Sequence, residues 1–289
     1  MSKSTVRPLE GKRILVTRTR EQASVLSERL RTLGATPVEF PTIRIVPPED
    51  WRTLDSALHQ LFISEGSAYD WLVLTSANGV TICCERLRTI GYEVRDLQIK
   101  QHVRVATIGP ATAAALARYG LTADLVPDEY IAESVIAALI ADAHQRGSSI
   151  AGQRILLARA SEARKVLVSE LRQAGALVNE VAAYDTLPVT HDDSHGREIL
   201  RLLLDRQLAI LTFTSSSTIR SFVTWLKNCE QDITTSFADL VTQYTQIASI
   251  GPITSQTARD LGLHVDIEAK EFTIEGLVNA IVQHREKVS

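Results

Sequence analysis

The chain has 289 residues, of which 45% are apolar, and a formal net charge of −3. This length is long for one hydrophobic core and is comfortable for two domains. The near balance of charge argues against a dedicated nucleic-acid-binding protein, which would show a basic patch, but it leaves the binding of a small anion open.

Neither targeting to a membrane nor disulfide chemistry is indicated. The first 13 residues are polar, and no apolar run approaches the length that spans a bilayer. The three cysteines, Cys83, Cys84 and Cys229, lack the spacing of metal ligands, so we expect buried, inert thiols in a reducing compartment. A cytoplasmic protein without nucleic-acid or membrane partners is therefore predicted.

Short apolar runs of strand length alternate with amphipathic stretches of helical period. In chain order, the first half predicts strands at residues 14–17, 71–75 and 103–108, with helical patterns at 25–33 and 54–62 between them. Strands that alternate with helices indicate parallel sheets covered by helices.

Helix starts carry local signals. Thr19 with Gln22 is typical of a capping box, and Pro110 and Pro252 suit the first position of a helix.

The chain repeats itself. Residues 11–47 (GKRILVTR…) match residues 152–188 (GQRILLAR…). Two further blocks follow in the same order, DWLVLTSANGV with LAILTFTSSSTI and VATIGPATAAAL with IASIGPITSQTA. The period is too long for a solenoid, so we infer tandem duplication of a domain-sized unit.

One extended stretch breaks the alternation in each copy, at residues 36–48 and 177–190. The prolines in these stretches suit exposed connectors, and two such connectors could pair as a bridge between lobes. The predicted fold is then α/β, with two flavodoxin-like or Rossmann-like parallel-sheet domains joined by a two-stranded β-ladder. The predicted parts are residues 1–40 plus 188–289 for one domain, 48–180 for the other, and connecting strands at 41–47 and 181–187.

No recognised cofactor, nucleotide or metal motif is present, since GxGxxG, Walker A, GxSxG, HExxH and Cys/His spacings are all missing. Hydroxyl-rich and glycine-containing turns instead recur at the predicted carboxyl ends of strands, the edge where open α/β sheets bind ligands. These turns supply the candidate binding residues Thr17, Arg18, Thr75, Ser76, Ala77, Gly109, Pro110, Ala111, Thr112, Thr214, Ser215, Ser216, Gly251, Pro252, Ile253 and Thr254.

Two interpretations of these turns remain open. The serines and threonines could simply be helix N-caps. Alternatively, because the set recurs in both copies, the turns form an anion-binding cleft between the lobes. In that case Gly109 and Gly251 let the backbone approach the ligand, and the amides of residues 111, 112, 253 and 254 point outward.

Arg18 and Arg159 occupy equivalent positions after the first strand of each copy. An arginine beside free helix N-termini suits carboxylates or phosphates, although a surface ion pair is an equal alternative. Tyr184 lies in the second connector, where a tyrosine usually serves packing unless a cleft faces it.

The opening ILVTR, the LTSANGV segment, the two IGP turns and the AAYDT connector followed by Pro188 occur in one order along the chain. Together with the duplication and the length, they resemble the uroporphyrinogen-III synthase family over nearly the full sequence. The second copy departs from the pattern, with FTSSST at the second turn and a longer insertion around residues 229–244.

The resemblance implies two flavodoxin-like lobes and a cofactor-free, metal-free lyase of tetrapyrrole biosynthesis. Its substrate would be hydroxymethylbilane, a linear tetrapyrrole with eight carboxylates, which loses its terminal hydroxyl and closes with ring D inverted. Tyr184 matches the family tyrosine suspected of assisting that loss. A monomer in transient contact with the upstream hydroxymethylbilane synthase is also expected.

Two other classes stay open on the residues alone. One is a hinged two-lobe protein that binds a small anion without catalysis. The other is a two-lobe transferase that uses a nucleotide sugar, which the absence of a nucleotide loop disfavours.

Overall fold

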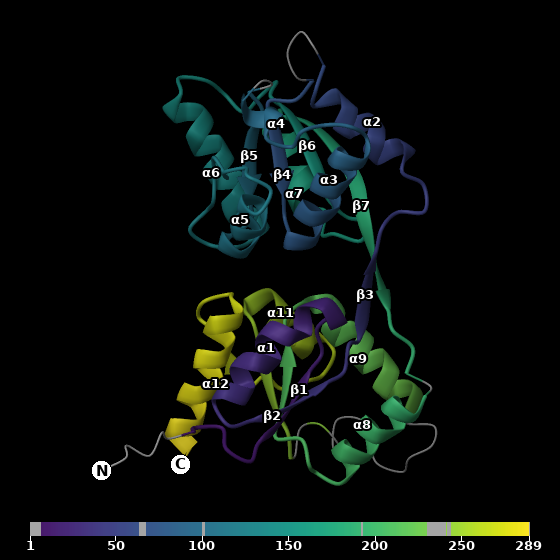
Figure 1. Ribbon diagram of the computed structural model, residues 1–289. Coiled ribbons are helices and arrows are strands. Elements are labelled where there is room, and N and C mark those ends of the chain that lie inside the picture. The colour runs from purple at the N-terminus through teal and green to yellow at the C-terminus, as the bar shows by residue number, and fades with distance from the viewer. Residues whose placement is uncertain are drawn as a thin grey trace, which may run out of the picture. The chain divides into compact units, whose positions relative to one another are not determined.

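The computed structural model describes residues 7–63, 68–99, 102–191, 193–229, 241 and 244–288. The chain divides into two compact units, the first formed by residues 1–44 with 187–289 and the second by residues 45–186 (Figure 1). The predicted α/β class and the predicted parallel sheets are both confirmed in each unit.

The first unit contains a five-stranded sheet in the order β10-β9-β8-β1-β2. All its pairings are parallel. The strands are β1 (Arg13–Val16), β2 (Thr36–Glu39), β8 (Ile210–Phe213), β9 (Gln246–Ser249) and β10 (Ile267–Glu268). The helices of this unit are α1 (Arg20–Thr32), α8 (Ser194–Leu204), α9 (Ser216–Cys229), α11 (Pro252–Asp260) and α12 (Ile274–Val288).

The second unit contains a sheet in the order β3-β7-β6-β4-β5, in which β7, β6, β4 and β5 run parallel. The strands are β3 (Ile43–Val46), β4 (Trp71–Leu74), β5 (Arg104–Thr107), β6 (Arg154–Ala160) and β7 (Leu177–Pro188). The helices are α2 (Arg52–Gln60), α3 (Ala77–Thr89), α4 (Asp96–Ile99), α5 (Pro110–Ala117), α6 (Ala132–Gln145) and α7 (Val166–Gln173).

The duplication is visible in the strand order, because β9-β8-β1-β2 of the first sheet corresponds to β5-β4-β6-β7 of the second. Each sheet mixes the two sequence copies. In the first sheet, β1 of the first copy pairs with β8 of the second copy, Leu15 lying opposite Leu211. In the second sheet, β6 pairs with β4, Leu157 lying opposite Val73.

The two extended stretches differ more than their sequences suggest. The first is divided into β2 and β3, with Pro41 between them, whereas the second is the single long strand β7. Pro37 lies within β2, which is tolerated because β2 is the edge strand of its sheet. β3 and β7 are hydrogen-bonded neighbours, as expected for the connecting strands, although β7 is longer than the predicted segment.

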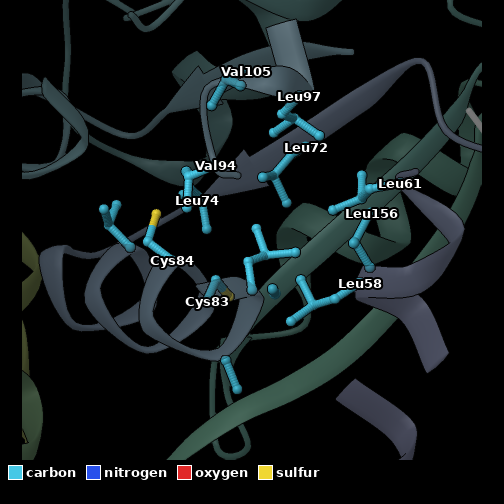
Figure 2. Packing of buried hydrophobic residues seen from close by; sticks show 14 of the residues in the cluster. Leu58, Leu61, Leu72, Leu74, Cys83, Cys84, Val94, Leu97, Val105 and Leu156 are labelled. Atoms are coloured by element: carbon cyan, nitrogen blue, oxygen red, sulfur yellow. The ribbon is translucent and has the colours of Figure 1, made fainter. Parts of the chain in front are cut away.

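Each sheet is buried on both faces because successive side chains of a strand point to opposite sides. In β4, Leu72 and Leu74 join the cluster under α2 and α3, while Trp71 and Val73 join the cluster under α6 and α7. Figure 2 shows the first of these clusters. The first unit is built in the same way, with one cluster under α8, α9 and α11 and another under α1 and α12.

Cys83 and Cys84 lie in the cluster of Figure 2 and are 1% and 2% exposed. Burial raises the pKa of Cys84 to about 12 and that of Cys83 as well, so both thiols stay protonated at neutral pH. Cys229 is only half-buried, so the expectation of burial was wrong for this residue. Within the described residues, no helix is long and apolar enough to cross a membrane.

Candidate functional site

The carboxyl ends of neighbouring parallel strands lie at one edge of each sheet. In the first sheet, β9, β8 and β1 are adjacent, so the turns at Gly251, Ser215 and Arg18 follow one another along that edge. In the second sheet, β6, β4 and β5 are adjacent and present Arg159, Ser76 and Gly109 at the corresponding places. Each edge therefore gathers one half of the predicted residues.

Arg18 is a half-buried cation without a counter-ion among the side chains that the structure describes, which do not include that of Glu21. One of its terminal nitrogens donates to Oε1 of Gln22 at 2.9 Å, and its buried Nε has no partner. Burial lowers the pKa of Arg18 to about 10, so the side chain still carries its charge at neutral pH. A retained charge that costs desolvation free energy is typical of a binding site.

The predicted capping box at Thr19 is not formed. Thr19 is the N-cap residue of α1, but its side chain makes no cap hydrogen bond. Gln22 accepts the Arg18 hydrogen bond instead.

Arg159 occupies the position equivalent to Arg18 but has different partners, and the ion-pair alternative describes it. Arg159 is 4% exposed, and it donates to Oε1 of Glu180 at 2.6 and 3.0 Å and to the carbonyl of Arg164 at 2.8 Å. Burial by itself would raise the pKa of Glu180, but the hydrogen bonds and charge of Arg159 lower it. Arg159 is therefore committed to a structural ion pair.

The equivalent glutamate explains the difference. Residue 39 of the first copy corresponds to residue 180 of the second, and Glu39 accepts a hydrogen bond from the buried Ser27 at 2.7 Å. Val168 stands where the first copy has Ser27 and cannot donate such a bond. Ser27 and Arg31, both on α1, thus hold the carboxylate of Glu39, whereas Glu180 pairs with Arg159.

The hydroxyl groups at the first edge have mixed partners. Thr17 is fully buried and donates to the carbonyl of Thr212 at 2.7 Å, so it supports the sheet. Ser215 accepts from the Thr218 N–H at 3.3 Å as an N-cap, and Ser216 bonds Thr257 at 2.7 Å. Thr214 is half-buried.

At the second edge, Ser76 is the N-cap of α3 and accepts from the Gly79 N–H at 3.0 Å. Its Oγ also lies 2.8 Å from the hydroxyl of Tyr184, whose side chain is 6% exposed. Burial raises the pKa of Tyr184 above its usual value, so the phenol stays protonated at neutral pH. The neighbouring Thr75 and Ala77 are half-buried.

The two IGP turns begin α5 and α11, with Pro110 and Pro252 at the predicted first position. Three of the four predicted outward amides, those of Ala111, Ile253 and Thr254, have no backbone acceptor among the described residues. The fourth prediction was wrong, because the Thr112 N–H donates to the Gly109 carbonyl at 3.1 Å.

The structure gives the two glycines a reason that the sequence did not suggest, while close approach of the backbone to a ligand stays a prediction. A Cβ on Gly109 would lie 2.9 Å from Cγ of Tyr130, and one on Gly251 would lie 2.8 Å from Cδ1 of Phe272. The glycines therefore make room for an aromatic ring of the same chain. Both rings follow their glycine by 21 residues, a repeated spacing in the sequence that would have revealed them.

The predicted insertion around residues 229–244 lies partly outside the described residues, which leave out 230–240 and 242–243. Its end, Tyr244, lies with its ring 3.5 Å from the guanidinium of Arg206. Within the described residues, no group of three or more His, Cys, Asp or Glu side chains could hold a metal ion.

The sequence of the chain is similar to those of known proteins. A family model described as uroporphyrinogen-III synthase HemD matches residues 24–279. A uroporphyrinogen-III synthase of Synechococcus elongatus is 36% identical over 279 residues, which cover 96% of each chain. That of Chlorobaculum parvum is 28% identical over 273 residues, which cover 94% of this chain and 98% of the relative.

Solved structures show the same fold at low identity. A mutant uroporphyrinogen III synthase of Thermus thermophilus superposes with a TM-score of 0.63 at 16% identity, covering 96% of this chain and 99% of the other. The protein described as uroporphyrinogen-III synthetase from Helicobacter pylori gives 0.54 at 14% identity, covering 94% and 98%.

Proposed function

Because the chain belongs to the uroporphyrinogen-III synthase family, an enzyme family of porphyrin biosynthesis, we propose that it cyclises hydroxymethylbilane to uroporphyrinogen III. The family match over residues 24–279 carries this proposal. In the proposed reaction the bilane loses its terminal hydroxyl as water, and the resulting cation is attacked by the substituted carbon of ring D. The spiro intermediate fragments and closes again with ring D inverted, which makes the enzyme a cyclising lyase.

The substrate carries eight carboxylates, and each sheet edge offers groups that would hold carboxylates. Arg18 supplies a positive charge without a counter-ion among the described residues. Ala111, Ile253 and Thr254 supply backbone N–H groups at the first turns of α5 and α11. Amides at a helix N-terminus and a guanidinium both favour carboxylates.

We assign the substrate-binding role to the candidate residues that retain a donor or lie beside one. These are Arg18, Thr75, Ser76, Ala77, Pro110, Ala111, Thr214, Ser215, Ser216, Pro252, Ile253 and Thr254. The role is not assigned to Thr17, Thr112 and Arg159, because their donors form bonds within the protein. It is not assigned to Gly109 and Gly251 either, because these glycines leave space for the aromatic rings.

Such a site suits a substrate that is reactive by itself. The bilane closes spontaneously to the uninverted isomer, so the protein has to decide which carbon of ring D attacks. Holding several carboxylates in fixed positions controls that geometry without a strong nucleophile. The proposal also includes a cytoplasmic monomer that receives the bilane from hydroxymethylbilane synthase.

The test is to supply the purified protein with hydroxymethylbilane and to resolve isomers I and III of the product. We expect isomer III to dominate at a rate proportional to protein concentration. Isomer I alone, formed at the spontaneous rate, would refute the proposal. If the protein then still bound the octacarboxylate uroporphyrin III, it would be a non-catalytic binding protein of the same ligand class.

A further inference from the structure

Tyr184 has a single hydrogen-bond partner within the described residues, the Oγ of Ser76 at 2.8 Å. A buried hydroxyl that donates to nothing costs free energy, so its proton is directed to an acceptor wherever one is present. Burial raises the pKa of Tyr184, and the phenol therefore has a proton to donate at neutral pH. Either hydroxyl could donate across this distance; we take Tyr184 as the donor, because Ser76 is the one acceptor for its proton among the described residues.

Ser76 consequently receives two hydrogen bonds, from the Tyr184 hydroxyl and from the Gly79 N–H at 3.0 Å. A serine hydroxyl has two acceptor lone pairs and one proton to donate. Both lone pairs are occupied, and no described residue accepts the remaining proton. Ser76 is half-buried, whereas Tyr184 is only 6% exposed.

The packing around this pair is specific to the second unit. A Cβ on Gly79 would lie 3.3 Å from Oγ of Ser76 and 3.9 Å from Cε1 of Tyr184, so the glycine leaves room for the tyrosine ring. At the corresponding turn of the first unit, Thr218 occupies the glycine position and Ser215 has no tyrosine partner among the described residues.

We propose that Ser76 donates its hydroxyl proton to a substrate carboxylate at the N-terminus of α3, and that Tyr184 acts as a positioning residue through Ser76. This inference rests on the proposed function and changes the role expected for Tyr184, which would not reach the leaving hydroxyl itself. Two donors on one oxygen fix the direction of the third hydrogen and polarise the O–H bond, so Ser76 is a strong, oriented donor. The positive end of α3 favours the same anion.

The experiment compares Ser76→Ala, Tyr184→Phe and the double variant by kcat, KM, isomer ratio and affinity for uroporphyrin III. Loss of a hydrogen bond to a charged group weakens binding by about 10- to 100-fold, so Ser76→Ala should raise KM and the dissociation constant by that factor. Tyr184→Phe should have a smaller effect in the same direction and retain mostly isomer III. The double variant should equal Ser76→Ala, because Tyr184 acts only through the serine.

Two further variants separate this role from a structural one. Ser76→Thr keeps the hydroxyl and the cap and should restore binding. Asp193→Ala removes the N-cap of α8, which accepts from the Gly196 N–H at 3.0 Å, and should lower stability by about 1 kcal/mol without moving KM.

The proposal is overturned if Tyr184→Phe abolishes turnover while Ser76→Ala spares it, or if the two effects multiply in the double variant. Unchanged uroporphyrin III affinity in Ser76→Ala would overturn it as well. These outcomes are distinct from failure of the proposed function, in which the unmodified protein would yield no isomer III. The binding measurement remains informative even then, because it needs no turnover.

Discussion

The ring of Tyr130 occupies the space that a side chain on Gly109 would need, with its Cγ 2.9 Å from the position of a Cβ. Phe272 has the same relationship to Gly251, at 2.8 Å. Both glycines have extended backbones that any residue could adopt, so the conflict is one of space and not of conformation. Each sheet thus carries a half-buried aromatic ring against the turn that begins its α5 or α11 helix.

Gly109→Ala should therefore destabilise the protein by about 1–3 kcal/mol, the usual cost of overpacking. The clash involves Cγ, Cδ1 and Cβ of Tyr130; Cβ is fixed by the backbone, and Cγ and Cδ1 could move away only by rotation of the whole ring about χ1. The penalty should shrink when Gly109→Ala is made in a Tyr130→Ala background, as urea unfolding of the four proteins would measure. Equal penalties in both backgrounds would show that the ring is not the obstacle.

Arg18→Met should weaken the binding of uroporphyrin III by about 10- to 100-fold without lowering the free energy of unfolding. The charge of Arg18 is desolvated and has no compensating carboxylate among the side chains that the structure describes, so we expect its loss to remove a folding cost. Fluorescence titration and urea unfolding would measure the two effects. Arg118→Gln, which removes an exposed charge at the end of α5, is the control for net charge.

Arg159→Met should instead lower the free energy of unfolding and leave the binding of uroporphyrin III largely unchanged. It leaves Glu180, which is 21% exposed, without its main partner, and breaking a buried pair costs about 3–5 kcal/mol. A stable Arg159→Met variant with a large loss of uroporphyrin III affinity would reverse the assignment of the two arginines.

Ser27→Val should weaken uroporphyrin III binding although Ser27 is fully buried. The substitution copies Val168 of the second copy and leaves Glu39 only its 3.9 Å ion pair with Arg31, so we expect the carboxylate to turn toward Arg18 as Glu180 does toward Arg159. Adding Glu39→Gln should restore much of the affinity, because an amide does not neutralise the guanidinium. No recovery in Ser27→Val/Glu39→Gln would mean that Glu39 does not compete for Arg18.

The Asp55–Arg86 pair predicts an acid-dependent part of the stability. Hydrogen bonds from Arg86, at 2.6 and 2.7 Å, hold the pKa of Asp55 below its usual range. A carboxyl whose pKa is lower in the folded state contributes stability above its unfolded pKa, near 4, and loses that contribution as the pH falls through the folded value.

Asp55→Asn should cost about 1–2 kcal/mol at pH 7, since both side chains are only about one-fifth exposed. The difference from the unmodified protein should diminish below pH 4, as urea unfolding at pH 7, 5 and 3 would show. The exposed Asp128→Asn is the control. A difference that stays constant with pH would contradict the assigned ion pair.

The sequence by itself determined the features that depend on neighbours along the chain. Apolar periodicity located β1, β4 and β5, and proline at the first helical position marked α5 and α11. The duplication placed equivalent turns after equivalent strands, which is why the sheet edges could be predicted as candidate sites. These signals are local, and each residue's own backbone preference or spacing suffices to produce them.

Tertiary structure alone decided which of the equivalent residues keep a charge or a hydrogen-bond donor that a ligand could use. Arg18 and Arg159 look alike in sequence, but Arg159 pairs with Glu180, whereas the equivalent Glu39 is held by Ser27 and Arg31. Tyr184 is likewise directed to Ser76 only because β7 and β4 flank β6 in one sheet. Charges and hydrogen bonds are satisfied by whatever the fold brings within about 3 Å, and residues that are distant in sequence supply those partners.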